Sequence, residues 1–461
     1  MASPQARLTE GSVGRHLVTM SVPVLFGIFT MMLQSCIDMW FIGRVGVREL
    51  AALSFAFPVI MVVTSVAIGL GAGTSSVVAR AIGAHNHRRA RRLATDSLIL
   101  SFGITMAMSV VGYLTIAPLF HLLGAPEDMI PLIAGYMNIL YTGVPFVVVG
   151  MVGMSSMRAT GDTKLPSMLM ILASVINILL DPILIFGVGP IPAMGLNGAA
   201  MAALLSRFGI FIGTVYYMKH RSDLLTFNKP DRVELSRSWA DILHVGIPAA
   251  GTNAIIPVAT GVITAMLARY GPETVAGFGV ASRVESLMLV MFYALSAIIG
   301  PFVGQNVSAN QPERIYRALQ LCTIFCIGSG FLIALALTLS GEWIPGLFSD
   351  SPDVIGVAAL FLTIVPIGYG AYGMVMVMNA SFNGMGKPMP AVHISVGRMV
   401  VIYIPLAFIA DRFFGVIGIF AAYMIANVVS GIVAYLWAHS SVQEQCDAHA
   451  VPPTAPVIEV T

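Results

Sequence analysis

Charged residues are scarce in this 461-residue sequence, since Asp, Glu, Lys and Arg together make up only 10% of it. A soluble globular domain carries about 25% charged residues, and apolar residues here reach 57%, which excludes a soluble fold. Cysteine is also scarce, and Cys36, Cys322, Cys326 and Cys446 show no disulfide framework and no zinc or redox spacing. No phosphate-binding loop or other enzyme motif occurs, so we expect no catalysis, no cofactor and no ATP-driven step. The net charge of +2 gives no reason to expect a nucleic-acid partner.

Long apolar runs are what the sequence has instead. They continue for about 20 residues, enough for a helix to cross the bilayer, and they lack the alternation of a transmembrane β-barrel. Because backbone polar groups in lipid must pair within the protein, we predict an all-α integral membrane protein with 12 transmembrane helices. The expected spans are residues 16–42, 50–80, 91–117, 129–156, 165–187, 195–218, 239–268, 275–303, 313–338, 353–381, 391–410 and 416–438.

The basic residues orient these spans. If the N-terminus and the even-numbered links share one side, 17 of the 24 Lys and Arg residues lie on that side and 4 on the other. Positive loops stay in the cytoplasm, so both termini are expected there, in a multi-pass protein of the cytoplasmic (inner) membrane. The first apolar run is too long for the core of a cleavable signal. The expected organisation is a cytoplasmic tail 1–15, an N-lobe 16–218, a cytoplasmic linker 219–238, a C-lobe 239–438 and a cytoplasmic tail 439–461.

The second half of the sequence repeats the first at a constant offset of 225 residues. Pro23 matches Pro248, and Arg89 in a basic link matches Arg314. Six spans per half is an even number, so both copies enter the membrane from the same side. The repeat therefore predicts two parallel six-helix lobes related by a pseudo-twofold axis along the membrane normal. Two such lobes enclose a cleft, which is typical of secondary transporters.

Two carboxylates interrupt the apolar spans of the first half. Asp38 lies in the first span and Asp181 in the fifth, each one to two turns from the outer end, and Asn177 is one turn before Asp181 on the same face. Ionisable groups at membrane depth are costly, and two carboxylates held together out of water favour binding a proton. We therefore predict a coupling site for a proton, or for Na⁺ bound by Asp38, Asn177 and Asp181. A structural polar cluster is the alternative. The repeat offset pairs the two acids with Ile263 and Leu406, so only the first lobe carries them.

Fewer polar residues interrupt the other spans. Arg283 and Glu285 in the eighth span are expected to pair with each other or to line the cleft, and local pairing is favoured. Arg207 and Arg398 lie close enough to cytoplasmic span ends for their side chains to reach water. Pro23 is expected to bend the first span, either as a hinge or as tolerated geometry. The glycines of GLGAG at 69–73 lie inside an apolar span, and they indicate close helix packing.

Taken together, these residues resemble the multidrug and toxic compound extrusion (MATE) family over about residues 15–440. The resemblance rests on the 6+6 plan, the spacing from Pro23 to Asp38, and four segments: RATGDTKLP from Arg158, NILLDPILI from Asn177, GLNGAAMAALLSR from Gly195 and VASRVESL from Val280. Asp38, Asn177 and Asp181 resemble the cation site of the DinF-like branch. The interior of spans seven and ten lacks the further acids expected of the NorM-like branch.

The resemblance implies a monomeric antiporter that exports organic, often cationic or amphipathic compounds in exchange for protons or sodium by alternating access. Small organic substrates and membrane lipids are the expected partners. The residues expected to line the substrate cleft are Gln34, Met154, Ser155, Arg283, Glu285 and Asn379. Two positions depart from the family pattern: an Asn would fall near Met154 or Ser155, and a Thr would fall at Ala203. Their absence removes oxygen ligands for sodium and favours protons.

Two other functions fit parts of the pattern. A flippase for lipid-linked oligosaccharides or lipids, from the same wider superfamily, would be expected to have a more cationic central cavity. A receptor or scaffold without flux would not need the duplicated six-span architecture.

Overall fold

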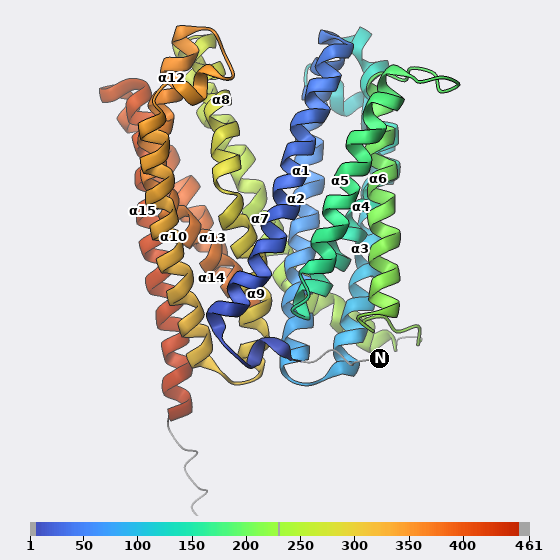
Figure 1. The fold of residues 1–461 in the computed structure, drawn as a ribbon, viewed down its shortest axis with the longest axis vertical. Coiled ribbons are helices and arrows are strands. Elements are labelled where there is room, and N and C mark those ends of the chain that lie inside the picture. The colour runs from blue at the N-terminus through green and yellow to red at the C-terminus, as the bar shows by residue number, and fades with distance from the viewer. Residues whose placement is uncertain (1–5, 229–230, 451–461) are drawn as a thin grey trace, which may run out of the picture.

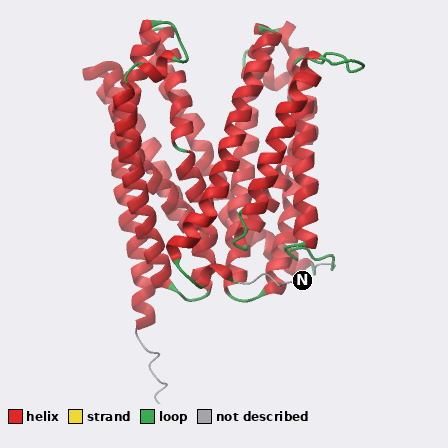
Figure 2. Ribbon diagram, in the orientation of Figure 1, coloured by secondary structure: helices red, strands yellow, loops and turns green. Residues whose placement is uncertain are grey.

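The computed structural model describes residues 6–228 and 231–450, without the side chains of 445–450. Within that range almost the whole chain is helical, and the helices stand side by side in two bundles (Figures 1 and 2). Cys36, Cys322 and Cys326 are free thiols. The predictions for the ends of both tails lie outside the described residues, and the side chain of Cys446 is not described.

The first bundle, the N-lobe, contains the helices that precede residue 221. They are α1 (Val13–Val45), α2 (Val47–Gly83), α3 (His87–Leu122), α4 (Ile130–Ala159), α5 (Lys164–Phe186) and α6 (Leu196–His220), with short 3-10 turns η1 (Arg7–Thr9) and η2 (Glu127–Met129).

The second bundle, the C-lobe, is more interrupted. Its elements are α7 (Arg232–Leu267), η3 (Ala268–Tyr270), α8 (Pro272–Met288), α9 (Val290–Ser308), α10 (Pro312–Ser340), α11 (Trp343–Gly346), α12 (Pro352–Ile364), η4 (Val365–Gly368), α13 (Tyr369–Gly384), α14 (Pro388–Val396), the π-helical turn η5 (Gly397–Tyr403) and α15 (Ile404–Ala450). The segment between the lobes is shorter than the predicted 219–238, because α6 continues to His220 and α7 begins at Arg232. The N-terminal tail is likewise shorter, since α1 begins at Val13.

The described residues contain 11 helical segments long and apolar enough to cross a membrane. The last, Pro388–Glu444, is 57 residues long and far exceeds one crossing. It breaks at Gly415, whose φ of 56° and ψ of −137° are not helical, so it makes two spans. The prediction of an all-α membrane protein with 12 spans is confirmed.

The internal repeat is visible in the backbone. His85 and Asn310 are 225 residues apart and occupy the same loop position after α2 and α9, and both adopt a positive φ, 54° and 62°. Gly161 and Gly386, also 225 apart, have φ of 88° and 76°. Residues other than Gly rarely adopt a positive φ, so its recurrence at one offset identifies equivalent turns.

Two helices exchange partners between the lobes. Leu17, Met20 and Val24 of α1 belong to the core of the C-lobe, whereas Ile42 near the other end of α1 belongs to the core of the N-lobe. Helix α7 mirrors this, since its beginning packs in the N-lobe and its later residues in the C-lobe. Figure 1 shows α1 crossing from one bundle to the other, with Pro23 inside a continuous helix.

The bundles come together at the end of the molecule that carries the N-terminus and the C-terminal part of α15, here called the terminal end (Figure 1). There α2 packs on α7 through glycines: a Cβ atom on Gly73 would lie 2.3 Å from the Ile242 carbonyl oxygen, and one on Gly69 would lie 2.5 Å from that of Gly246. The predicted close helix packing at 69–73 is therefore confirmed.

Candidate functional site

The carboxylates predicted from the sequence lie together in the N-lobe. Helix α1 carries Asp38 and Gln34, and α5 carries Asp181 and Asn177. The Gln34 amide donates to Asp38 Oδ2 at 3.3 Å and also to Asn177 Oδ1, while Asn177 Nδ2 donates to Asp181 Oδ1 at 3.2 Å. One amide chain thus connects both acids across two helices.

This network leaves one oxygen of each acid free. Asp38 Oδ1 and Asp181 Oδ2 are buried and have no hydrogen-bond donor among the described residues. Asp181 is 1% exposed and Asn177 is fully buried, whereas Asp38 is half-buried. A buried carboxylate oxygen without a partner is costly, and a proton or a small cation is the species that would relieve the cost.

The equivalent positions of the C-lobe are apolar. Ile263 is fully buried in the C-lobe core, and Leu406 packs against that core. The asymmetry read from the repeat therefore holds in three dimensions: the paired acids belong to one lobe only.

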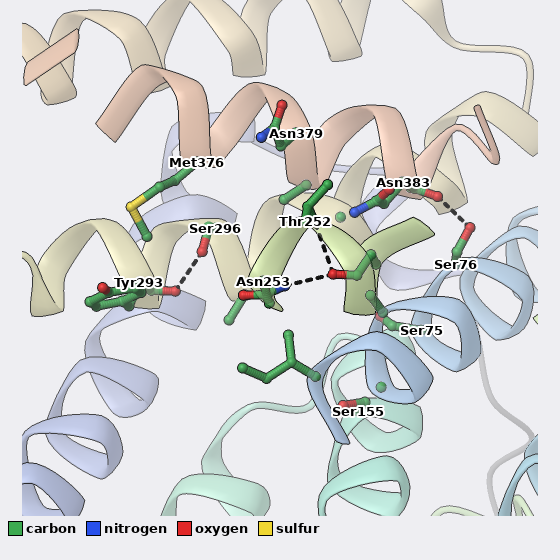
Figure 3. A pocket seen from close by; sticks show the side chains of 18 of the residues that line it. Ser75, Ser76, Ser155, Thr252, Asn253, Tyr293, Ser296, Met376, Asn379 and Asn383 are labelled. Atoms are coloured by element: carbon green, nitrogen blue, oxygen red, sulfur yellow. Dashed lines mark hydrogen bonds between the residues drawn. The ribbon is translucent and has the colours of Figure 1, made fainter. Parts of the chain in front are cut away.

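A separate cavity of about 380 Å³ lies between the lobes. Figure 3 shows its polar wall, with Ser75, Ser76 and Ser155 of the N-lobe facing Tyr293, Asn379 and other C-lobe residues. The two sides touch where Ser76 Oγ donates to the Asn383 carbonyl oxygen at 2.5 Å. A cavity bounded by both lobes changes shape whenever the lobes move.

Only part of the predicted substrate cleft lines this cavity. Ser155 and Asn379 do, whereas Gln34, Met154, Arg283 and Glu285 do not. Gln34 serves the carboxylate network instead, and Met154 is buried in the N-lobe core.

The predicted local pairing of Arg283 with Glu285 is wrong. These residues form no ion pair in the described chain, because they project from different sides of α8. Arg283 is exposed and its Nη2 lies 3.6 Å from Met39 Sδ, whereas Glu285 lies beside Tyr369 and Tyr423 in the C-lobe.

The cavity is also lined by two arginines that the sequence analysis did not assign to the site. Arg158 at the end of α4 donates to Ser155 Oγ at 2.7 Å, and Arg398 of η5 donates to Asn427 Oδ1 at 2.9 Å. Arg398 is 3% exposed, so the expectation that its side chain reaches water is wrong. Arg207 is exposed and lines a smaller N-lobe pocket of about 90 Å³.

Comparison with known proteins gives consistent matches over nearly the whole chain. The MatE family model matches residues 23–183 and 248–409, two segments with the offset of the internal repeat. A protein of Shewanella oneidensis named FAD transporter is 39% identical over 93% of this chain and 95% of its own length. The multidrug export protein MepA of Staphylococcus aureus is 24% identical, covering 93% and 94%. The solved structure of the Vibrio cholerae MATE transporter VcmN in its bent form has a TM-score of 0.89 and 30% identity, covering 94% of this chain and 98% of that one.

Proposed function

The chain belongs to the MATE family of membrane transporters, and from this premise we propose that it is a secondary active exporter of small organic molecules. The single observation that carries the coupling part of the proposal is the amide-linked pair Asp38 and Asp181, with one free oxygen on each acid. A site that binds a proton or Na⁺ gives the transporter a route to the energy of an ion gradient.

The mechanism follows from opposed binding preferences. Coupling ion and cargo exchange when each binds a different state of the two lobes, so their binding free energies are linked. Asp38 lies on α1, whose other half packs on the C-lobe, so a charge change at Asp38 acts on a helix that belongs to both lobes. Pro23 is the proposed hinge, because it lies in that exchanged half and lacks a backbone donor. The proposed topology puts both termini in the cytoplasm, in an inner-membrane monomer.

Protons are the favoured coupling ion in this proposal. No Asn stands near Met154 or Ser155 and no Thr stands at Ala203, where the family often has them, so a full set of ligands for Na⁺ is harder to assemble. The same carboxylates need nothing further to take up a proton. Sodium coupling is the alternative, and the experiment below tests it separately.

The cargo has two candidate descriptions. Relatives named for multidrug export favour drugs as cargo, and the family resemblance implies organic, often cationic or amphipathic compounds. The relative named FAD transporter favours a flavin dinucleotide, and the two arginines of the central cavity support a cargo of that charge. A cationic cavity is also what a lipid-linked oligosaccharide flippase would need, but the family match supports a MATE transporter.

The proposal is tested in proteoliposomes loaded with cargo. Organic cations and flavins are followed by fluorescence under a proton gradient alone, then under a sodium gradient alone. Asp38→Asn and Asp181→Asn should each reduce gradient-driven flux to background while insertion and thermal stability persist. Asp411→Asn changes a C-lobe carboxylate that pairs with Arg269 and accepts from Tyr270, and this matched control should retain flux. Full flux in both site variants, or no gradient dependence in the wild type, would refute the coupling site.

A further inference from the structure

The central cavity carries positive charge and no negative charge. Arg158 and Arg398 line it, and no Asp or Glu occurs among its described lining residues. Neither arginine has a carboxylate oxygen within 4 Å in the part of the chain that the structure covers. Guanidinium groups that lack a carboxylate at ion-pair distance attract anions strongly in a low-dielectric, part-enclosed space.

The Arg398 side chain is held in place by its neighbours. Its Nη1 donates to Asn427, its guanidinium lies 4.3 Å from the centre of the Tyr372 ring, and its Nε has no acceptor among the described residues. The donor is therefore rigidly supported yet incompletely satisfied, since only 3% of the residue is exposed. It also lies in the π-helical turn η5, and such turns often occur at functional sites.

One acid lies near the Arg398 guanidinium and offsets part of its charge. Glu285 of α8 is close enough to Arg398 to interact electrostatically, but it does not line the cavity. The repeat also argues for a dedicated role, because the N-lobe residues 225 positions before Glu285 and Arg398 are Ile60 and Ala173. This polar cluster belongs to the C-lobe alone, as the carboxylate pair belongs to the N-lobe.

We propose that the central cavity binds an organic anion, with Arg398 and Arg158 contacting its phosphate or other acidic group from the two lobes. The inference rests on the proposed export function and names the substrate class of that cavity. Tyr293 and Tyr372 also line the cavity and provide aromatic surface for a ring system. The cargo class is therefore an aromatic anion, in contrast to the cations expected from the family resemblance.

Binding to the purified full-length protein in a neutral detergent tests this. The probes are riboflavin 5′-phosphate, riboflavin and ethidium, which compare a ring with a phosphate, the same ring without one, and a cation. The phosphate ester should bind at least about tenfold tighter than riboflavin, since charge-assisted pairs are the strong ones. Equal affinity for the two flavins, or tighter binding of ethidium, would overturn the proposal.

Substitutions of single residues test which side chains cause the preference for the phosphate ester. Arg398→Gln and Arg158→Gln should each weaken binding of the phosphate ester by about tenfold and leave riboflavin within about twofold. Arg412→Gln removes an exposed C-lobe arginine and should change neither. Glu285→Gln should tighten binding of the ester, because it removes a negative charge near Arg398. This variant tests the role of the Arg398 charge even if Arg398→Gln does not fold. Equal losses of ester and riboflavin in both arginine variants would argue against anion binding.

A lipid headgroup offers the same phosphate chemistry. Binding in nanodiscs that contain phosphatidylglycerol is compared with binding in nanodiscs of phosphatidylcholine only. Equal affinity for the ester in both supports a soluble anion. Loss of ester binding only in the nanodiscs with phosphatidylglycerol overturns that assignment. No ion gradient is present, so a failed binding test leaves coupled export standing. A failure of the Asp38 and Asp181 flux test would likewise leave a binding result intact.

Discussion

At the scale of single residues, Gln34 is the side chain that joins the two halves of the carboxylate site. Its one amide nitrogen donates to Asp38 and to Asn177, which in turn donates to Asp181. Removing it breaks the amide chain but leaves both acids in place, so the effect should be smaller than the loss of either carboxylate.

We predict that Gln34→Ala lowers the initial rate of gradient-driven flux several-fold, roughly the effect of about 1 kcal/mol per lost hydrogen bond. The measurement is flux in proteoliposomes against the size of the ion gradient. Cys36→Ala, an exposed free thiol on the same helix, serves as the control and should behave as wild type. An unchanged rate in Gln34→Ala would mean that the amide chain plays no part in coupling.

The same residues show what sequence can reveal at this scale. Asp38 and Asp181 were predictable because a carboxylate in an apolar run has few structural explanations. Arg158 and Arg398 were not, because a basic residue near a span end is already explained by topology and by side chains reaching water. The inward direction of Arg398 depends on the π-helical turn and on Asn427, which lies on another helix.

At the scale of elements, helix contacts depend on the small residues of α2. Gly73 allows the backbone of α7 to approach so closely that an added methyl would lie 2.3 Å from the Ile242 carbonyl oxygen. That neighbour is backbone and cannot rotate away, so the helices must separate.

We predict that Gly73→Ala destabilises the protein by about 1–3 kcal/mol, in the range of overpacked cores. Thermal unfolding in detergent, followed by the loss of monodisperse protein on heating, measures this. Gly103→Ala on α3 is matched in chemistry, but no atom lies within 4 Å of the added methyl, so its unfolding temperature should stay close to wild type. Equal unfolding temperatures for both variants would show that the α2–α7 contact is looser than described.

The elements themselves were largely predictable, and their interruptions were not. Twelve apolar runs of spanning length fix the number and order of the helices. The break between α8 and α9 at Leu289 and the partner exchange of α1 and α7 depend on contacts between distant segments. Periodicity within one run carries no information about them.

At the scale of the whole molecule, the N-terminal segment 6–11 connects the two lobes at the terminal end. Leu8 packs beside Gly161 of the N-lobe, and its backbone nitrogen donates to Gln305 Oε1 of the C-lobe at 3.2 Å. Arg314 of α10 donates to the Leu8 and Gly11 carbonyl oxygens at 3.0 and 2.8 Å. These bonds exist only while the lobes are close at this end, so they stabilise one state of the transport cycle.

We predict that Arg314→Gln shifts the lobes toward the state open at the terminal end. Arg314 is partly exposed, so its lost bonds amount to about 1 kcal/mol, which changes the ratio of the two states about fivefold. Ser76→Cys reports the shift, because Ser76 lines the cavity and contacts Asn383 across the lobes. A membrane-permeant thiol reagent should label that cysteine faster in the Arg314→Gln background.

Arg317 provides the matched comparison, since it lies one turn along α10, is exposed and makes no bond to the N-terminal segment. Arg317→Gln should leave the labelling rate of Ser76→Cys unchanged. If both arginine variants accelerate labelling equally, the effect is one of surface charge. If neither does, other contacts between the lobes, such as that of Ser76 with Asn383, hold them together, and the N-terminal segment follows their motion without stabilising either state.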